Sequence, residues 1–284
     1  MESGAALIGA LPDYRIRARN LSRYAANKIH DDEVARRHGY AAGLVAGTTV
    51  YAYMTHPLVA AWGLDWLARG SARLALLRPV YDGDEVTVET RVTARSGTEA
   101  AGEVAAEVTA LTARGPAATL LAGLDWGGPA LGPDLGGYPA APLPAVPPPA
   151  SEAALAGLDP LGSPALPLDE GEVAGYAADV DDPLPVYPGP DGVAHPGLLL
   201  QQANRALAEN VALGPWVHVT SESVHCGLAR VGERVTTRGR VARVFEKKGH
   251  RFVELDLLLV ADDERPVMLV RHVAIYELRG GSHG

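Results

Sequence analysis

A proline-rich stretch in the middle of the chain constrains the fold more than any other feature. Half of the 22 prolines of this 284-residue chain lie between residues 127 and 168, several of them in the run PLPAVPPPA. Proline has no N–H to donate and cannot continue a strand or a helix, so this stretch predicts a semi-extended linker with one short helix at SEAALAGL. We therefore expect three parts: a unit over 1–126, a linker over 127–168 and a unit over 169–284.

The two flanks of this linker resemble each other. Three short patterns occur in both flanks in the same order and at nearly constant separation. The paired segments are YAAN (24–27) and YAAD (176–179), GLV (43–45) and GLL (197–199), and VYDGDEV (80–86) and ARVGERV (229–235). One such match is compatible with chance, but three in order predict a duplicated unit of roughly 120 residues.

Each unit contains an apolar segment followed by strand patterns. Residues 41–64 carry no Asp, Glu, Lys or Arg. This length is enough for a membrane span, but the polar and proline residues within it favour a helix wrapped by protein: Thr48, Thr49, His56 and Pro57. The predicted strands are EVTVETRVTA, EVAAEVTALTA and PAATLLAGL in the first unit, and RVTTRGRVARV, RFVELDLLLVA and PVMLVRHVAIYEL in the second. Gly249 is expected at the tip of a hairpin. These patterns predict an α+β fold with a curved antiparallel sheet around one buried helix in each unit.

The composition narrows the possible partners. A net charge of −9 and a pI of about 5.5 argue against a broad nucleic-acid-binding surface. Cys226 is the one cysteine, so no intrachain disulfide can form, which is typical of a reducing compartment. The N-terminal segment has an early Glu and no basic start, which makes it a poor signal peptide. We expect a cytoplasmic protein without a nucleic-acid or membrane partner.

The stretch YAANKIHDDEVARRHGYAAGLVAG resembles the MaoC-like family of (R)-specific enoyl-thioester hydratases and dehydratases. That family shows the pattern D-x-N-P-[IL]-H-x-D-x3-A, then a Gly-aromatic pair and a helix start that ends in H-G. The matching positions here are Asn27, Ile29, His30, Asp32, Gly39, Tyr40 and Gly47. RPVYDGDEV is similar to the strand entry of the family, and YAADVDDPLPVY resembles its non-catalytic halves. The resemblance covers roughly residues 13–126 and 169–279. It implies a double hot-dog fold: two antiparallel sheets, each wrapped around a central apolar helix.

The sequence departs from the family pattern at three places. Ala25 stands where the family has its catalytic aspartate, five residues before the histidine, and Lys28 replaces the proline after the asparagine. At the helix start, Ala46-Gly47 replaces H-G.

The resemblance implies a site built from a base and a helix end. Hydration of an enoyl thioester needs a group that activates water and a dipole that stabilises the enolate oxygen. His30 is expected to be the acid/base group. The backbone amides at the start of the apolar helix are expected to bind the carbonyl oxygen, and the candidates are Gly43, Ala46, Gly47 and Thr48. The partner of His30 stays open between Asn27, Asp31 and Asp32, of which Asp32 is also suited to cap a helix.

The second unit is expected to contribute pocket walls rather than chemistry. Six residues after Tyr176 stands Asp182, whereas His30 stands six residues after Tyr24. The apolar helix of this unit would bring Gln201, Gln202 and Asn204 to the pocket. Tyr24 and Tyr176 are expected to pack in their own units. The basic residues between Arg15 and Arg37 are compatible with an anionic carrier.

The predicted function is hydration of a 2-enoyl thioester carried by coenzyme A or an acyl carrier, or the reverse dehydration. No cofactor and no metal site are expected, because the sequence has no P-loop and no spaced His/Cys cluster. Two alternatives remain open: a non-catalytic protein that binds an acyl thioester or a polyketide-like ligand, and a thioesterase-like enzyme. A homodimer is compatible with all three.

Overall fold

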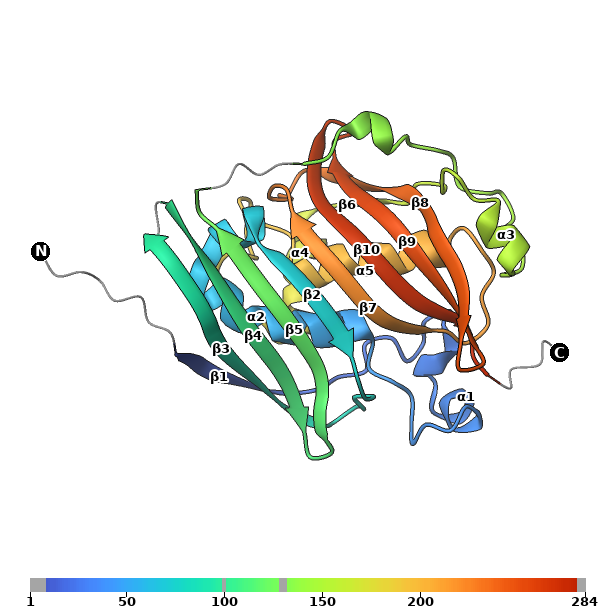
Figure 1. Cartoon of the computed structure of the whole chain (residues 1–284), viewed down its shortest axis with the longest axis horizontal. Helices are drawn as coiled ribbons and strands as arrows, with labels where there is room; N and C mark the ends of the chain where they lie inside the picture. The colour runs from blue at the N-terminus through green and yellow to red at the C-terminus, as the bar shows by residue number, and fades with distance from the viewer. Residues whose placement is uncertain (1–8, 99–100, 128–131, 280–284) are drawn as a thin grey trace, which may run out of the picture.

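One antiparallel sheet runs through the whole molecule (Figure 1). The computed structural model describes residues 9–98, 101–127 and 132–279, and within them ten strands join in the order β1-β3-β4-β5-β2-β7-β10-β9-β8-β6. The strands are β1 (Ala10–Arg17), β2 (Ser71–Leu76), β3 (Glu85–Thr98), β4 (Ala101–Thr112), β5 (Gly115–Asp125), β6 (Ala165–Pro167), β7 (Val217–His225), β8 (Arg234–Lys247), β9 (His250–Ala261) and β10 (Arg265–Glu277).

The strand order repeats within the sheet. Read from each outer edge inward, the first half runs β1-β3-β4-β5-β2 and the second half runs β6-β8-β9-β10-β7. Each half therefore places its five strands in the same relative order, and the halves meet where β2 pairs with β7. We call this β2–β7 ladder the seam. The topology agrees with a duplicated unit, and the pairing at the seam makes the two sheets continuous.

Two helices lie together against one face of this sheet (Figure 1). They are α2 (Gly47–Arg69), which follows β1, and α5 (Pro196–Ala208), which follows β6. Their buried apolar side chains form one core with the inward-facing residues of the strands. The shorter elements are η1 (Lys28–His30), α1 (Asp32–Arg37), η2 (Leu135–Gly137), α3 (Glu152–Ala156) and α4 (Glu170–Asp179). No helix in the described part of the chain is both long enough and apolar enough to span a bilayer.

The apolar segment 41–64 is only partly helical. The helix begins at Gly47, and Leu44 instead forms a β-bridge with Tyr81. The prediction that the helix opens at Gly43 was wrong, because the residues before Gly47 form an extended entry that is paired to the chain around Val80. The helix continues past residue 64 to Arg69, with a break at Gly63, whose φ of 55° is favourable only for glycine.

The long strands were predicted correctly, and the short ones were missed. All six alternating segments form β3–β5 and β8–β10, and Gly249 takes a φ of 77° at the β8–β9 hairpin tip, as expected. No strand was predicted at β1, β2, β6 or β7. Two of these, β2 and β7, form the seam, so the join between the halves was not visible in the sequence patterns.

The proline-rich segment does more than connect the halves. Its short helix α3 forms close to the expected position, and β6, which lies inside residues 127–168, pairs with β8. Tyr138 packs on Leu258 and Val260, and its hydroxyl donates a hydrogen bond of 2.9 Å to Asp256 Oδ1. The part of the segment around Tyr138 therefore covers a patch of the second half of the sheet that lies apart from the main core.

The three sequence matches differ in structural meaning. Gly83 and Gly232 are equivalent: each takes a positive φ in a turn, Gly83 in the turn before β3 and Gly232 in the turn before β8. The other two matches do not mark equivalent positions. Tyr176 is buried in α4 as predicted, whereas the prediction that Tyr24 packs was wrong, since its side chain is 92% exposed in a turn.

Candidate active site

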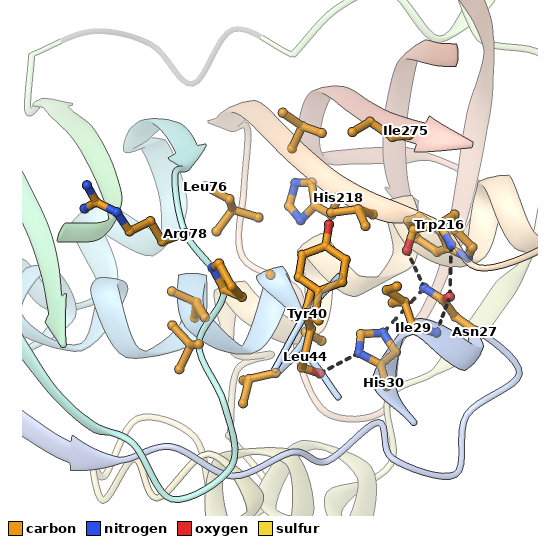
Figure 2. Close-up of a pocket in the computed structure, with 18 of the residues that line it drawn as sticks. Asn27, Ile29, His30, Tyr40, Leu44, Leu76, Arg78, Trp216, His218 and Ile275 are labelled. Atoms are coloured by element: carbon orange, nitrogen blue, oxygen red, sulfur yellow. Dashed lines mark hydrogen bonds between the residues drawn. The ribbon is translucent and has the colours of Figure 1, made fainter. Parts of the chain in front are cut away.

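A pocket of about 270 Å³ lies where the seam ends (Figure 2). The β2–β7 pairing stops at Ala75 and Thr220. The residues just beyond this pair, Leu76 of β2 and Val219 of β7, both line the pocket. The turn η1, the start of α2 and one residue of α5 complete the wall. The lining is mostly apolar with a few polar groups, which is typical of a site for a small organic ligand. Both halves of the chain contribute to it.

His30 enters this pocket from η1 as a neutral base. Its ring Nδ1 donates a hydrogen bond of 2.7 Å to the carbonyl oxygen of Leu44. Because a carbonyl only accepts, Nδ1 carries the proton and the lone pair of the neutral ring is on Nε2. Burial lowers the pKa of His30 below its usual value, and the Leu44 carbonyl only partly opposes this effect. The ring is therefore neutral at neutral pH.

Asn27 holds His30 and the second half of the chain together. Its Oδ1 accepts hydrogen bonds from the N–H groups of Ile29 and Trp216, each at 3.2 Å. Its Nδ2 donates to the Trp216 carbonyl at 3.0 Å and lies 3.5 Å from His30 Nε2. The asparagine thus caps η1 while it ties this turn to the segment that leads into β7, and its position beside His30 was anticipated from the sequence.

The N-terminus of α2 opens into the same pocket without a side-chain cap. Ala46 is the N-cap residue and has no side chain that can accept a hydrogen bond. The first amides of a helix have no partner inside the helix, so the Gly47 N–H is left at the positive end of the helix dipole. Gly47 lines the pocket, and a Cβ at this position would clash with Leu76 and lie 2.7 Å from His218 Nδ1. Only glycine leaves this helix end open.

The structure places the other predicted site residues elsewhere. Asp31 caps α1, because its Oδ1 accepts from the N–H groups of Glu33 and Val34, both at 3.0 Å. Its carboxylate is therefore committed to the helix rather than to His30, and it is Asp31 and not Asp32 that forms the cap. Asp32 Oδ1 accepts from Gly43 N–H at 2.9 Å, so the Gly43 amide is not free to bind a carbonyl oxygen.

The remaining predicted residues, on α2 and α5, do not all reach this pocket. Thr48 does not line this pocket and contributes instead to a separate, more polar hollow. Of the three predicted wall residues of α5, only Asn204 lines the pocket. Gln201 lines the other hollow, and the Gln202 side chain bonds Leu198 and Arg205.

No carboxylate lines the pocket among the described residues. Ala25, at the position of the family's aspartate, is exposed and lies outside the lining. Within the described chain, no three His, Cys, Asp or Glu side chains are grouped so that they could hold a metal ion. The polar groups of the pocket are therefore imidazole, amide, phenol, guanidinium and backbone groups rather than carboxylates.

Sequence reasoning missed two polar residues of the pocket. Arg78, at its rim, is the one charged residue among the described residues that line it, whereas several arginines between Arg15 and Arg37 form ion pairs on the surface. Arg78 belongs to the RPVYDGDEV motif, so the sequence did contain a signal for it. His218 had no signal, because β7 itself was not predicted. Figure 2 shows His218 in the pocket wall together with Tyr40, Leu76 and Ile275.

The corresponding helix end in the second half is closed. His195 is the N-cap of α5, and its Nδ1 accepts a hydrogen bond of 3.0 Å from Gly197 N–H. Its Nε2 donates at 3.2 Å to Asp182, whose other oxygen lies 2.9 Å from His56 Nδ1. Burial alone would raise the pKa of Asp182, but these two histidine contacts hold it well below its usual range. The cluster is buried and structural, and it leaves one open helix end in the pair.

No protein-family model matches the sequence, and a search of curated proteins gives no match. Similar solved structures do exist. A structure described as a MaoC-like dehydratase is 14% identical, covers 93% of this chain and 98% of its own, and has a TM-score of 0.64. A MaoC domain dehydratase from Chloroflexus aurantiacus J-10-fl is 15% identical, with 96% and 95% coverage and a TM-score of 0.65.

The description of a third similar structure states its fold. A conserved hypothetical protein from Mycobacterium tuberculosis, described as having a double hot-dog fold, is 19% identical, with 93% and 94% coverage and a TM-score of 0.63. At these identities the likeness establishes the fold. With two matching five-stranded halves, one long helix in each and near-complete coverage, this chain is a double hot-dog protein.

Proposed function

We propose that the pocket binds an acyl thioester and that His30 catalyses the addition of water to a 2-enoyl group, or the reverse dehydration. One observation carries this proposal: a neutral, half-buried histidine, whose unprotonated Nε2 has only a long contact of 3.5 Å to Asn27 Nδ2, and an uncapped helix N-terminus line the same mostly apolar pocket. The first is suited to move a proton, and the second to stabilise negative charge on a carbonyl oxygen.

Each part of the pocket has a role in this reaction. In hydration, His30 Nε2 takes a proton from water while the oxygen of that water bonds to C3, and the carbonyl oxygen gains negative charge beside Gly47 N–H. The enolate then takes a proton at C2, which His30 can return. The apolar lining would hold the acyl chain, and Arg78 at the rim would meet a phosphate of coenzyme A or of an acyl carrier.

The test is a hydration assay with crotonyl-CoA and crotonyl-pantetheine, since pantetheine is common to both carriers. His30→Gln is expected to lower kcat by about 10²-fold or more, because general acid–base catalysis contributes roughly this much. Asp31→Asn, a neighbour that caps α1, is the matched control and is expected to keep wild-type turnover. Equal rates for the wild type and His30→Gln would refute the role of His30.

The pH profile provides a second readout of the same group. His30 must be neutral to act as a base, and its pKa is lowered by burial. Activity is therefore expected to be constant around neutral pH and to fall only below pH 6.5. This acid limb should be absent from the residual activity of His30→Gln.

A second candidate is a protein that binds the same ligands without converting them. It is favoured by the lack of a carboxylate among the described pocket residues, since the related family divides water activation between Asp and His. Binding of butyryl-CoA with no hydration and no release of free thiol would support it. Release of free thiol from crotonyl-CoA would instead indicate the thioesterase-like reaction.

A further inference from the structure

We propose that His218, which comes from the second half of the chain, is a further substrate-contacting residue of this pocket. Its Nδ1 would donate a hydrogen bond to the thioester carbonyl oxygen, beside the Gly47 amide at the start of α2. This inference rests on the proposed function, because it assumes that the ligand is a thioester. It assigns to the second half a direct part in the chemistry rather than a part in the pocket wall alone.

The first observation is an unsatisfied nitrogen. His218 is buried, with 6% of its surface exposed, and its Nδ1 has no hydrogen-bond partner of acceptable geometry among the described residues. A buried polar atom without a partner is costly, and such atoms need an explanation. His225 and His272 also have one ring nitrogen without a hydrogen-bond partner among the described residues, but neither lines this pocket, whereas His218 does. A ligand in the pocket could therefore complete the hydrogen bonding of His218 and not that of the other two.

The second observation is the place of this nitrogen. A Cβ built on Gly47 would lie 2.7 Å from His218 Nδ1, so the ring lies directly against the uncapped end of α2. An oxygen that accepts a hydrogen bond from the Gly47 amide is therefore close to His218 as well. Two donors that converge on one oxygen form an arrangement suited to the charge that develops on a thioester carbonyl during hydration.

The third observation is a hydrogen-bonded chain behind the ring. His218 Nε2 lies 2.8 Å from Ser221 Oγ, which lies 2.9 Å from His272 Nδ1, and the two imidazoles stack at 4.3 Å. When His272 Nδ1–H donates to Ser221 and Ser221 O–H donates to His218 Nε2, the proton of His218 is on Nδ1, facing the pocket. The reverse direction leaves a lone pair there. Both states are neutral, so a carbonyl ligand selects the first without placing a charge in the core.

The charge state of His218 agrees with this role. Burial lowers its pKa to about 4, so the ring is neutral at neutral pH. A neutral imidazole is a poor proton source but a good hydrogen-bond donor at a carbonyl oxygen. In this arrangement, His30 transfers the proton of the water, and His218 and the Gly47 amide bind the thioester carbonyl oxygen.

The test compares two unreactive ligands that differ only in the carbonyl group. Butyryl-CoA has the thioester carbonyl, and S-butyl-CoA is the matching thioether without it. The wild type is expected to bind the thioester more tightly than the thioether, and the hydrogen bond from His218 should account for about 10-fold of this preference. His218→Phe should remove that share and leave the share of the Gly47 amide, and His218→Asn, whose side-chain amide can donate from near the Nδ1 position, should restore part of what is lost.

Kinetics with crotonyl-CoA provide the second readout. A hydrogen bond to this oxygen strengthens as the enolate forms, so His218→Phe should lower kcat, by about 10²-fold, more than it raises KM. Ser221→Ala breaks the chain behind the ring and should lower kcat by a smaller factor. Ser223→Ala removes a hydroxyl from the same strand, where it contacts Tyr51 and not the pocket, and should not change kcat.

The outcomes separate the two proposals. Wild-type protein that binds neither ligand and does not hydrate crotonyl-CoA contradicts the proposed function, and this inference with it. Wild-type protein that is active, with an unchanged thioester preference and an unchanged kcat in His218→Phe, overturns this inference alone. Thermal melting shows whether His218→Phe is folded. If it is not, an unchanged kcat in both Ser221→Ala and His218→Asn overturns the inference equally.

Discussion

At the residue scale, the protonation state of His30 is set by the backbone and by burial rather than by a carboxylate. The Leu44 carbonyl fixes which nitrogen carries the proton, and Asn27 fixes the turn on which the ring is placed. A carboxylate partner would raise the pKa of the ring, whereas the burial seen here lowers it. This environment keeps His30 ready to accept a proton at neutral pH.

The family's aspartate position gives a prediction about a single residue. Ala25 is exposed and does not line the pocket, so a carboxylate there would remain in solvent. Ala25→Asp is therefore expected to change the turnover of crotonyl-CoA by less than about 2-fold, as is usual for a surface substitution. Steady-state kinetics on the two proteins check this. A clear gain in kcat would mean that the loop moves to bring residue 25 into the pocket.

The sequence identified the single residues that a local motif carries. Asn27, His30 and Gly47 meet at one pocket, and all three belong to one continuous stretch of the first half. It did not identify His218, whose part in the pocket depends on a strand from the other half. It also could not decide between Asp31 and Asp32, because adjacent acidic residues differ only in which backbone N–H they can reach once the chain has folded.

At the element scale, the two long helices differ in how they begin. α2 begins after Ala46 with no side-chain cap, whereas α5 begins after His195, which caps it. An N-cap side chain stabilises a helix by about 1 kcal/mol, so the bare start of α2 costs stability. The open end is what the proposed reaction needs, because a cap would occupy the amides that bind the carbonyl oxygen.

This difference predicts a trade-off at one position. Ala46→Ser adds a hydroxyl that can accept from the first-turn amides of α2, so the free energy of unfolding should rise by about 0.5–2 kcal/mol. The same hydroxyl competes with the ligand, so the affinity for butyryl-CoA should fall. Urea denaturation and titration of the ligand measure the two effects. A variant that gains stability and loses no affinity would show that these amides do not bind the thioester.

Elements were predictable where their patterns were long. The six long strands have extended apolar patterns, and each half has one apolar segment that becomes a buried helix. The seam strands have little such signal: β2 has 6 residues and β7 is the mixed sequence VHVTSESVH. Their identity as strands depends on pairing with each other and with β5 and β10, which is tertiary information that local periodicity does not contain.

At the scale of the whole molecule, several histidines are buried in the neutral form. The pKa is lowered by burial for His195, His218, His225 and His272. For His218 and His225 it falls from 6.5 to about 4, which corresponds to about 3 kcal/mol of stability for each group, lost progressively until the pH reaches that lowered value. Because the unfolded chain binds more protons than the folded chain in this range, stability is lost as the pH falls.

The protein is accordingly expected to be acid-labile. Its free energy of unfolding should decrease steadily from pH 6.5 to about pH 4, and urea denaturation between pH 7.5 and 4.5 measures this. The lowered pKa of Asp182 acts in a different range, since its contribution is lost only below the usual pKa of an aspartate. His225→Gln, at a site remote from the pocket, should reduce the slope. A free energy of unfolding that does not change over this range would contradict the expectation.

The joining of both halves in one polypeptide has a consequence for how such a protein can change. In an assembly of two identical subunits, a mutation that caps the N-terminus of the central helix in one subunit also caps it in the other, because one gene encodes both. When the two copies are halves of one chain, each helix N-terminus can mutate independently of the other. His195 can cap one helix while Ala46 leaves the other uncapped, so the two halves of one chain need not carry the same site.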